Sequence, residues 1–280
     1  MKKISRRSFL AAAAVSAAAL ALTACGGSAS TASSAAASSV AASSEAASTS
    51  AAAAELTTVE AGKLTMATNA AFPPYEMTTD AGAFEGIDID TAQAIADKLG
   101  LELQIDDMDF DAALLSVQQG KADIAMAGVT VTDERKNVMD FSDSYATGIQ
   151  SIIVPEGSDI ASPDDLAGKM IGTQRGTTGY IYCSDDFGDE NVVAYDDGLT
   201  AVQALNNGQV DAVVIDNAPA QEFIAANPGL KILDTSYAEE DYAIGMAKGS
   251  SLEDAVNAAL KELKADGTLQ SIVDKYITAE

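Results

Sequence analysis

The chain has 280 residues, with 42 acidic and 16 basic side chains, no histidine and two cysteines, so its net charge is −26. A charge this negative excludes nucleic acid as a partner, because proteins that bind it neutralise phosphates with Lys and Arg. The absence of histidine excludes a Ser–His or Cys–His nucleophile, and the usual zinc ligand sets are missing too. We therefore expect no metal and no cofactor.

Residues 1–25 have the pattern of a bacterial export signal. Four basic residues within 2–7 precede an apolar run at 9–24, which at about 16 residues is short for a membrane span. The segment 22–25, Leu-Thr-Ala-Cys, resembles a lipobox, whose cysteine accepts diacylglycerol. We predict a lipoprotein signal peptide with lipidation at Cys25, which anchors the protein to the cell membrane outside the cytoplasm; a plain membrane anchor or secretory signal is the alternative. Arg6-Arg7 also resembles a twin-arginine signal, so both export routes stay open.

Residues 26–58 are almost all Ala, Ser, Thr and Gly. This composition buries too little apolar surface to offset the entropy lost on ordering the chain, so we predict a disordered tether. The remaining ~220 residues form either one large domain or two lobes of about 100 residues each. One cysteine, Cys183, is left after Cys25, so an intramolecular disulfide is not expected.

Strand and helix patterns alternate along the first half of the folded part. Strands are expected at 63–68, 101–105 and 123–127, and a Pro-rich turn at 72–75 follows the first of them. Helices are expected at 91–99, closed by Gly100, and at 112–119, closed by Gly120. This alternation favours an α/β lobe with a largely parallel sheet.

The pattern recurs in the second half, with strands expected at 151–154 and 169–172 and a helix from Thr177. Segments 114–128 and 202–216 both run helix, glycine, aspartate, apolar strand, and aligning their glycines places Gly128 opposite Asp216. Each then follows the carboxyl end of a strand, where ligands gather in open α/β sheets. Two such lobes favour a cleft between them, although helix–glycine–strand units recur in any α/β protein. A helical region at 251–277, interrupted by Gly267, is expected to pack on the first lobe.

Arg135 is one of two arginines that follow the predicted signal peptide, the other being Arg175. Thr132 is a good N-cap, so Arg135 falls in the first turn of a helix, where a positive charge opposes the helix dipole. We therefore expect its guanidinium to face a negative group. That group is either a nearby acid such as Asp133 or the carboxylate of a ligand, which the planar guanidinium suits.

Two further features complete a possible site for a zwitterion. Gln174, Thr177 and Thr178 follow a strand and open a helix, and the free N–H groups of a helix start bind anions. Asp216 follows an apolar strand and either accepts from a ligand ammonium or caps the helix that opens near Pro219. Three aromatic side chains on loops after strands pack either on a ligand or in a lobe core: Phe72, Tyr75 and Phe110.

Eight segments, in order along the chain, resemble the polar amino acid-binding family of ABC-transporter solute-binding proteins, family 3. The first is Asn-Ala-Ala-Phe-Pro-Pro-Tyr-Glu within 68–76, and the others are 85–90, 108–112, 128–135, 140–145, 176–178, 216–219 and 265–268. The resemblance implies a periplasmic-binding-protein-like α/β fold, with two lobes joined by hinge strands near 146–150 and 239–243. Lobe 1 would comprise 59–147 plus 242–280, and lobe 2 would comprise 148–241.

The resemblance also implies roles for single residues. Arg135 would bind the ligand α-carboxylate, helped by the backbone N–H groups of Thr130 and Thr178. The α-ammonium would meet Asp216, the Gly128 carbonyl and the Thr130 hydroxyl, while two aromatic rings enclose the ligand side chain. The expected ligand-binding residues are Asn69, Phe72, Tyr75, Phe110, Gly128, Val129, Thr130, Arg135, Gln174, Thr177, Thr178 and Asp216.

Asn69 and Gln174 stand where members of this family sense the ligand side chain. The position of Asn69 is often Asp in members that bind cationic or amide side chains, so Asn argues against lysine and arginine. Glutamine and cystine are the favoured ligands. Glu76 and Arg175 either reach the side-chain end or, as we expect, face solvent.

The predicted function is capture of a polar L-amino acid by a monomeric, non-enzymatic component of an ABC importer. The ligand would bridge the lobes and favour their closed form, which a membrane permease recognises. One alternative is a ligand-sensing lipoprotein that delivers its ligand to a receptor. Another is a dehydratase-like enzyme on the same scaffold, with Glu76 or Asp109 as the general acid.

Overall fold

The computed structural model describes residues 56–277 of the chain. The predicted signal peptide, Cys25 and the predicted tether as far as residue 55 lie outside these residues. Between residues 56 and 277, no helix has both the length and the apolar character needed to cross a membrane.

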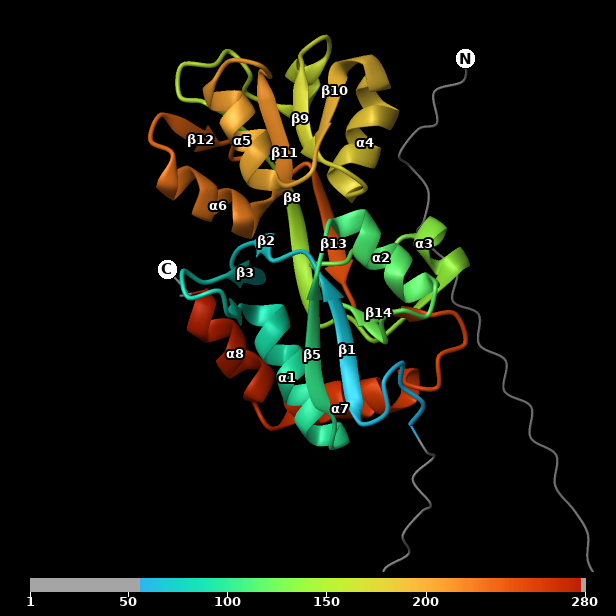
Figure 1. Ribbon diagram of the computed structural model, residues 1–280. Helices are drawn as coiled ribbons and strands as arrows, with labels where there is room; N and C mark the ends of the chain where they lie inside the picture. Colours follow the sequence, from blue (N-terminus) through green and yellow to red (C-terminus); the bar gives the residue numbers. More distant parts are fainter. Residues whose placement is uncertain (1–55, 278–280) are drawn as a thin grey trace, which may run out of the picture. The chain divides into compact units, whose positions relative to one another are not determined.

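The first lobe is built on a five-stranded sheet (Figure 1). Its strands, in spatial order, are β5 (Glu102–Asp107), β1 (Lys63–Thr68), β6 (Ile124–Ala125), β14 (Gly245–Ala247) and β7 (Met139–Phe141). β1 runs parallel to β5 and β6, whereas β14 is antiparallel to β6 and β7. A small antiparallel sheet of β2 (Ala71–Phe72), β3 (Glu76–Thr78) and β4 (Phe84–Glu85) follows β1 in the chain. The parallel strands agree with the sequence-based prediction.

Both predicted helices of this lobe begin earlier than expected. α1 (Ile87–Leu99) begins at Ile87 rather than 91, because Gly86 adopts φ 134° and two aspartates in the first turn complement the helix dipole. Gly100, in the left-handed conformation, ends α1 as predicted. α2 (Phe110–Gln118) begins at Phe110 rather than 112, and α3 (Asp133–Val138) follows Thr132.

The second lobe has its own sheet, in the order β10 (Val192–Tyr195), β9 (Ile171–Gln174), β11 (Ala212–Asp216), β8 (Ala146–Pro155) and β12 (Leu230–Ile232). β9 is parallel to β10 and β11, and β8 is antiparallel to β11 and β12. Its helices are α4 (Thr178–Phe187), α5 (Gly198–Asn206) and α6 (Asn217–Ala226), with 3-10 turns at Pro163–Leu166 and Asp189–Asn191. In both lobes a helix, α2 or α5, precedes a central strand, β6 or β11, as the repeat predicted.

The two predicted hinge segments form one antiparallel pair. β13 (Ala238–Tyr242) pairs with the first half of β8, from Tyr242 opposite Ala146 to Ala238 opposite Gln150. Figure 1 shows these two strands running side by side through the middle of the folded part. Because β8 continues as a sheet strand of the second lobe, the hinge and that sheet share one backbone.

The C-terminal helices pack on the first lobe, as predicted. α7 (Glu253–Ala265) and α8 (Thr268–Tyr276) both contact α1, and Gly267, at φ 81°, separates them. Leu260 and Leu263 of α7 are buried with Ile95 of α1 in one apolar cluster. Burying these side chains contributes about 1.5–3 kcal/mol each.

Candidate functional site

A narrow cavity is lined by residues of both lobes. All predicted ligand-binding residues except Tyr75 and Val129 line it, and Glu76 and Ala127 are additional. The lining residues are Asn69, Phe72, Glu76, Phe110, Ala127, Gly128, Thr130, Arg135, Gln174, Thr177, Thr178 and Asp216.

Arg135 is fixed by the start of α3. The Thr132 hydroxyl accepts from the Arg135 backbone N–H at 3.1 Å, which confirms the predicted cap. The guanidinium is buried, donates to the Thr130 carbonyl at 2.7 Å and to the Gly176 carbonyl at 3.1 Å, and lies 5.3 Å from the centre of the Phe110 ring. Burial lowers the pKa of Arg135, which nevertheless stays charged at neutral pH.

The alternative role for Arg135, a local ion pair, is absent. Lys136, the next residue along α3, is the one that pairs with Asp133, at 3.8 Å. The Arg135 guanidinium therefore has carbonyl partners from the two lobes and no carboxylate partner among residues 56–277. A buried guanidinium without a carboxylate partner can pair with an anion that enters the cavity.

Asp216 is the last residue of β11 and directly precedes α6. It occupies the N-cap position of α6 but makes no capping hydrogen bond. Instead its Oδ2 accepts from Gln150 Nε2 at 2.8 Å, which argues against the capping role. The pKa of Asp216 is raised to about 7, mainly by burial and also by the nearby carboxylate of Glu240, while hydrogen bonds oppose the rise.

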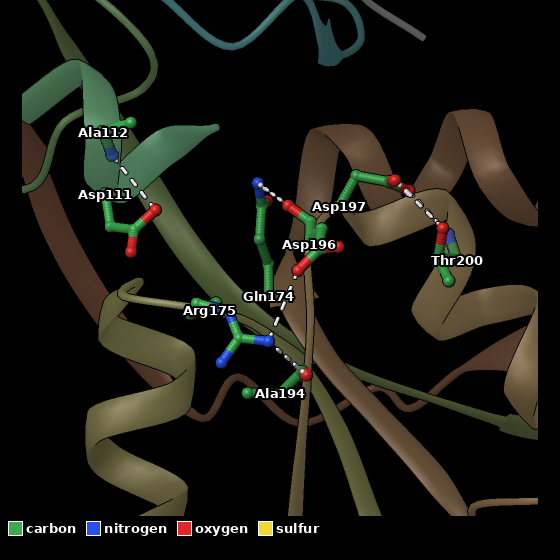
Figure 2. A network of polar contacts seen from close by, with 8 residues as sticks. All are labelled: Asp111, Ala112, Gln174, Arg175, Ala194, Asp196, Asp197 and Thr200. Carbon is green, nitrogen blue, oxygen red and sulfur yellow. Dashed lines mark hydrogen bonds and ion pairs between the residues drawn. The ribbon is translucent and has the colours of Figure 1, made fainter. Parts of the chain in front are cut away.

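The start of α4 adopts the predicted loop-to-helix geometry. Thr177 is the N-cap and accepts from the Tyr180 N–H at 3.3 Å, which leaves Thr178 as the first helical residue. Gln174 Nε2 donates to Asn69 Oδ1 at 2.8 Å, joining the two lobes beside the cavity. Gln174 also reaches the Asp196 carbonyl at 3.3 Å, a contact visible in Figure 2.

The aromatic residues divide into two groups. Phe72 and Phe110 line the cavity, as the predicted enclosing role requires. Tyr75 lies one layer behind, with its ring 6.1 Å from Phe72 and 5.2 Å from Tyr242. Val129 is fully buried and does not line the cavity, and its carbonyl accepts from the Ala243 N–H at 3.0 Å. Tyr75 and Val129 are therefore placed to support the site from behind.

The expectation that Glu76 faces solvent is wrong. Its side chain is fully buried and lines the cavity, because β2 and β3 pair with Phe72 opposite Glu76. Neither Glu76 oxygen meets an N–H group or a hydroxyl in the part of the chain that the structure describes, and the Glu76 carboxyl group pairs with that of Asp88. Burial and the neighbouring carboxyl group of Asp88 raise the pKa of Glu76 well above its ordinary value.

Arg175, in contrast, faces solvent as expected. About half of its side chain is exposed. Its Nη2 donates to Asp196 Oδ1 and to the Ala194 carbonyl, each at 3.3 Å (Figure 2). Asp109, a candidate general acid in the enzyme alternative, is exposed and does not line the cavity.

Two polar residues of the site were not anticipated from the sequence. Gln150 on β8 and Glu240 on β13 are both buried. Glu240 Oε2 accepts from Thr130 Oγ1 at 3.1 Å, Thr178 Oγ1 at 2.9 Å and Gln150 Nε2 at 3.1 Å. The hinge strands thus supply polar partners to the lining residues Thr130, Thr178 and Asp216. The acidic run around Glu240 is a weak sequence signal, and Gln150 has none.

A model of the family described as bacterial extracellular solute-binding proteins, family 3, matches residues 64–279. The chain belongs to this family. Its predicted two-lobed α/β fold and the resemblance of its motifs are thereby confirmed. Extracellular solute-binding proteins of ABC transporters act outside the cytoplasm, in transport and not in catalysis.

Relatives within the family are named for different amino acids. The L-cystine-binding protein TcyJ of Escherichia coli K12 is 31% identical over 226 residues, which are 79% of this chain and 85% of the relative. The arginine-binding extracellular protein ArtP of Bacillus subtilis 168 is 32% identical over 228 residues, or 78% of this chain and 87% of the relative. A solved structure of an ancestral arginine-binding protein bound to glutamine has a TM-score of 0.74 and 41% identity, covering 78% of this chain and 99% of that one.

Proposed function

We propose that the protein is the extracytoplasmic solute-binding component of an ABC importer and captures one polar L-amino acid between its lobes. The observation that carries the proposal is the lining of the cavity. It includes a buried Arg135 that pairs with no carboxylate among residues 56–277, and a buried Asp216 that does not cap the helix that follows it. A zwitterion satisfies both groups at once. The family and its relatives named for cystine, arginine and histidine support this assignment.

The proposed contacts follow from the donors and acceptors of the cavity wall. Arg135 binds the α-carboxylate with the N–H group of Thr178 at the start of α4. Asp216, the Gly128 carbonyl and the Thr130 hydroxyl accept from the α-ammonium. Closure of the lobes brings these two half-sites together, and the ligand stabilises the closed form because only that form offers both.

The side-chain end of the ligand faces Asn69, Gln174 and Glu76. Asn69 alone favoured an uncharged side chain, such as that of glutamine or cystine. Burial and the neighbouring Asp88 favour the protonated form of Glu76 in the ligand-free cavity, and a ligand guanidinium would favour its ionised form by supplying positive charge and N–H donors. We therefore propose arginine as the first ligand to test, with glutamine and cystine next.

A thermal-shift screen of the 20 common amino acids, cystine and ornithine tests the proposal on protein freed of ligand by unfolding and refolding. A ligand at about 100 times its Kd adds ~2.7 kcal/mol to stability, so a true ligand gives a clear increase in Tm. If no amino acid raises Tm, the proposed function is wrong. The ligand found in the screen is then incubated with the protein and analysed by NMR. A ligand that stays unchanged supports a binding protein, whereas conversion to a product supports the dehydratase-like alternative.

Uptake of the labelled ligand into cells that lack the gene separates an importer component from a sensor. Loss of uptake, restored by the wild-type gene, supports the importer, whereas unchanged uptake supports the sensor.

We further propose a monomer with lobe 1 at 59–147 plus 242–280, lobe 2 at 148–241, and a lipid anchor on Cys25. Labelled palmitate should enter the wild-type protein and not Cys25→Ala, and light scattering should give the mass of a monomer.

A further inference from the structure

Glu240 lies on the hinge strand β13 and contacts hydroxyl groups from both lobes. Its Oε2 accepts from Thr130 Oγ1, in the first lobe, at 3.1 Å and from Thr178 Oγ1, at the start of α4, at 2.9 Å. Glu240 is only 7% exposed, so water does not compete for these hydrogen bonds. One carboxylate oxygen thus joins the hinge, the first lobe and the second lobe.

These contacts fix the direction in which the two hydroxyl groups donate. A threonine hydroxyl has a single proton, and here both protons point to Glu240. The two hydroxyl oxygens lie 3.5 Å apart, and both residues line the cavity. Toward a ligand, Thr130 and Thr178 therefore offer lone pairs and no hydroxyl proton.

Gln150 donates to Asp216 as well as to Glu240, so that Asp216 also remains an acceptor. Its Nε2 donates to Asp216 Oδ2 at 2.8 Å and to Glu240 Oε2 at 3.1 Å, so both amide protons are directed at carboxylates. The side chains of Thr130, Thr178 and Asp216 thus present acceptors only. An ammonium group, with three donors and a positive charge, satisfies these acceptors, whereas a methylene group in its place leaves them unpaired.

We infer that Glu240 is a positioning residue that makes the cavity selective for ligands with an ammonium group, because it holds the two threonine hydroxyls as acceptors. This inference rests on the proposed function. It assigns to the hinge a part in ligand choice, in addition to its part in joining the lobes.

Calorimetric titration of the full folded chain with two ligand pairs tests the inference. The pairs are L-arginine with 5-guanidinopentanoic acid, and L-glutamine with 4-carbamoylbutanoic acid; the second member of each lacks only the amino group. The variants are Glu240→Gln, which keeps an acceptor without the charge, and Glu240→Met, which removes both. Glu239→Gln is the matched control, since Glu239 is the exposed neighbour on the same strand.

Glu240→Gln should weaken binding of the amino acid about fivefold and Glu240→Met about thirtyfold or more, because charge-assisted hydrogen bonds are about twice as strong as neutral ones. The amino-free analogues should change less than about threefold, so the preference for the amino acid falls in the same order. Glu239→Gln should leave every Kd within about twofold.

Equal weakening of both members of a pair would overturn the inference, since it would mean that Glu240 only holds the lobes together. Unchanged preference in Glu240→Gln would overturn it as well, and this variant keeps the shape of the side chain if Glu240→Met does not fold. If the wild type binds neither amino acid of the two pairs nor any other, the proposed function fails and the inference with it. If the wild type binds an amino acid and the Glu240 variants keep its preference over the amino-free analogue, the inference is rejected and the proposed function stands.

Discussion

The buried carboxylate of Asp216 should weaken the ligand-free protein, so Asp216→Asn should stabilise it. Asparagine has nearly the same shape, and its side-chain oxygen can still accept the hydrogen bond from Gln150 Nε2, which spans 2.8 Å. The substitution removes the charge, which at 6% exposure is almost cut off from water. An ionised group in such a place destabilises the fold unless a cation accompanies it.

The size of the effect follows from the pKa of Asp216, which burial raises from 3.8 to about 7. Below pH 3.8 the carboxyl is protonated in the folded and the unfolded chain, so its charge costs nothing. As pH rises from 3.8 to about 7, only the unfolded chain ionises, and the folded state loses stability by 1.36 kcal/mol per pH unit. Above pH 7 the loss is complete, at about 4 kcal/mol.

Unfolding by heat and by urea, on protein freed of ligand, measures the difference at pH 5 and pH 8. Because buried sites relax, we expect Asp216→Asn to gain about 2 kcal/mol or more at pH 8, or about 4–8 °C in Tm, and less at pH 5. Saturating ligand should reverse the order, since only the wild type retains tight binding. The exposed Asp234→Asn is the matched control and should change stability by less than about 0.5 kcal/mol. A gap that does not grow with pH would refute the reasoning.

Three further substitutions test other parts of the site. Arg135→Ala should weaken binding of the amino acid about 100-fold or more in calorimetry, because the ligand carboxylate loses a buried partner. The exposed Lys136→Ala is the control and should leave Kd within about twofold. Sub-micromolar binding by the Arg135 variant would contradict the assignment. Glu76→Gln should lower the affinity for L-arginine about tenfold or more and that for L-glutamine less than threefold, and equal losses would exclude a charge-specific role. Gly148→Ala should lower the free energy of unfolding in urea by about 1–3 kcal/mol, because its Cβ would lie 2.5 Å from the ring of Tyr242 on the facing hinge strand. Gly157→Ala is the control and should be neutral, because nothing lies within 4 Å of its Cβ.

The parts of the site that lie in local patterns were predictable from the sequence. Arg135 follows a capping threonine, and its charge opposes the helix dipole, so a partner of opposite charge was expected. Asp216 was found by aligning two helix–glycine–strand segments, which the structure places as α2–β6 and α5–β11. In both cases the neighbouring residues fix the backbone, and the backbone fixes the side chain.

Long-range pairing explains what the sequence did not predict. Glu240 and Gln150 contact residues that line the cavity because β13 and β8 pair as a hinge, although the two residues are 90 positions apart. Glu76 is buried because the short strands β2 and β3 fold back on each other after a Pro-rich turn. Local alternation does not indicate which face of such strands meets the cavity, so these acids looked like ordinary surface residues.

The double membership of β8 has a mechanical consequence. Gln150 stands opposite Asp216 in the pairing with β11 and opposite Ala238 in the pairing with β13. From Gln150 onward, β8 is therefore hydrogen-bonded into the sheet that carries Asp216. Rotation of the second lobe about the residues before Gln150 would carry Asp216 with it and would release a solute without rearranging the interior of either lobe.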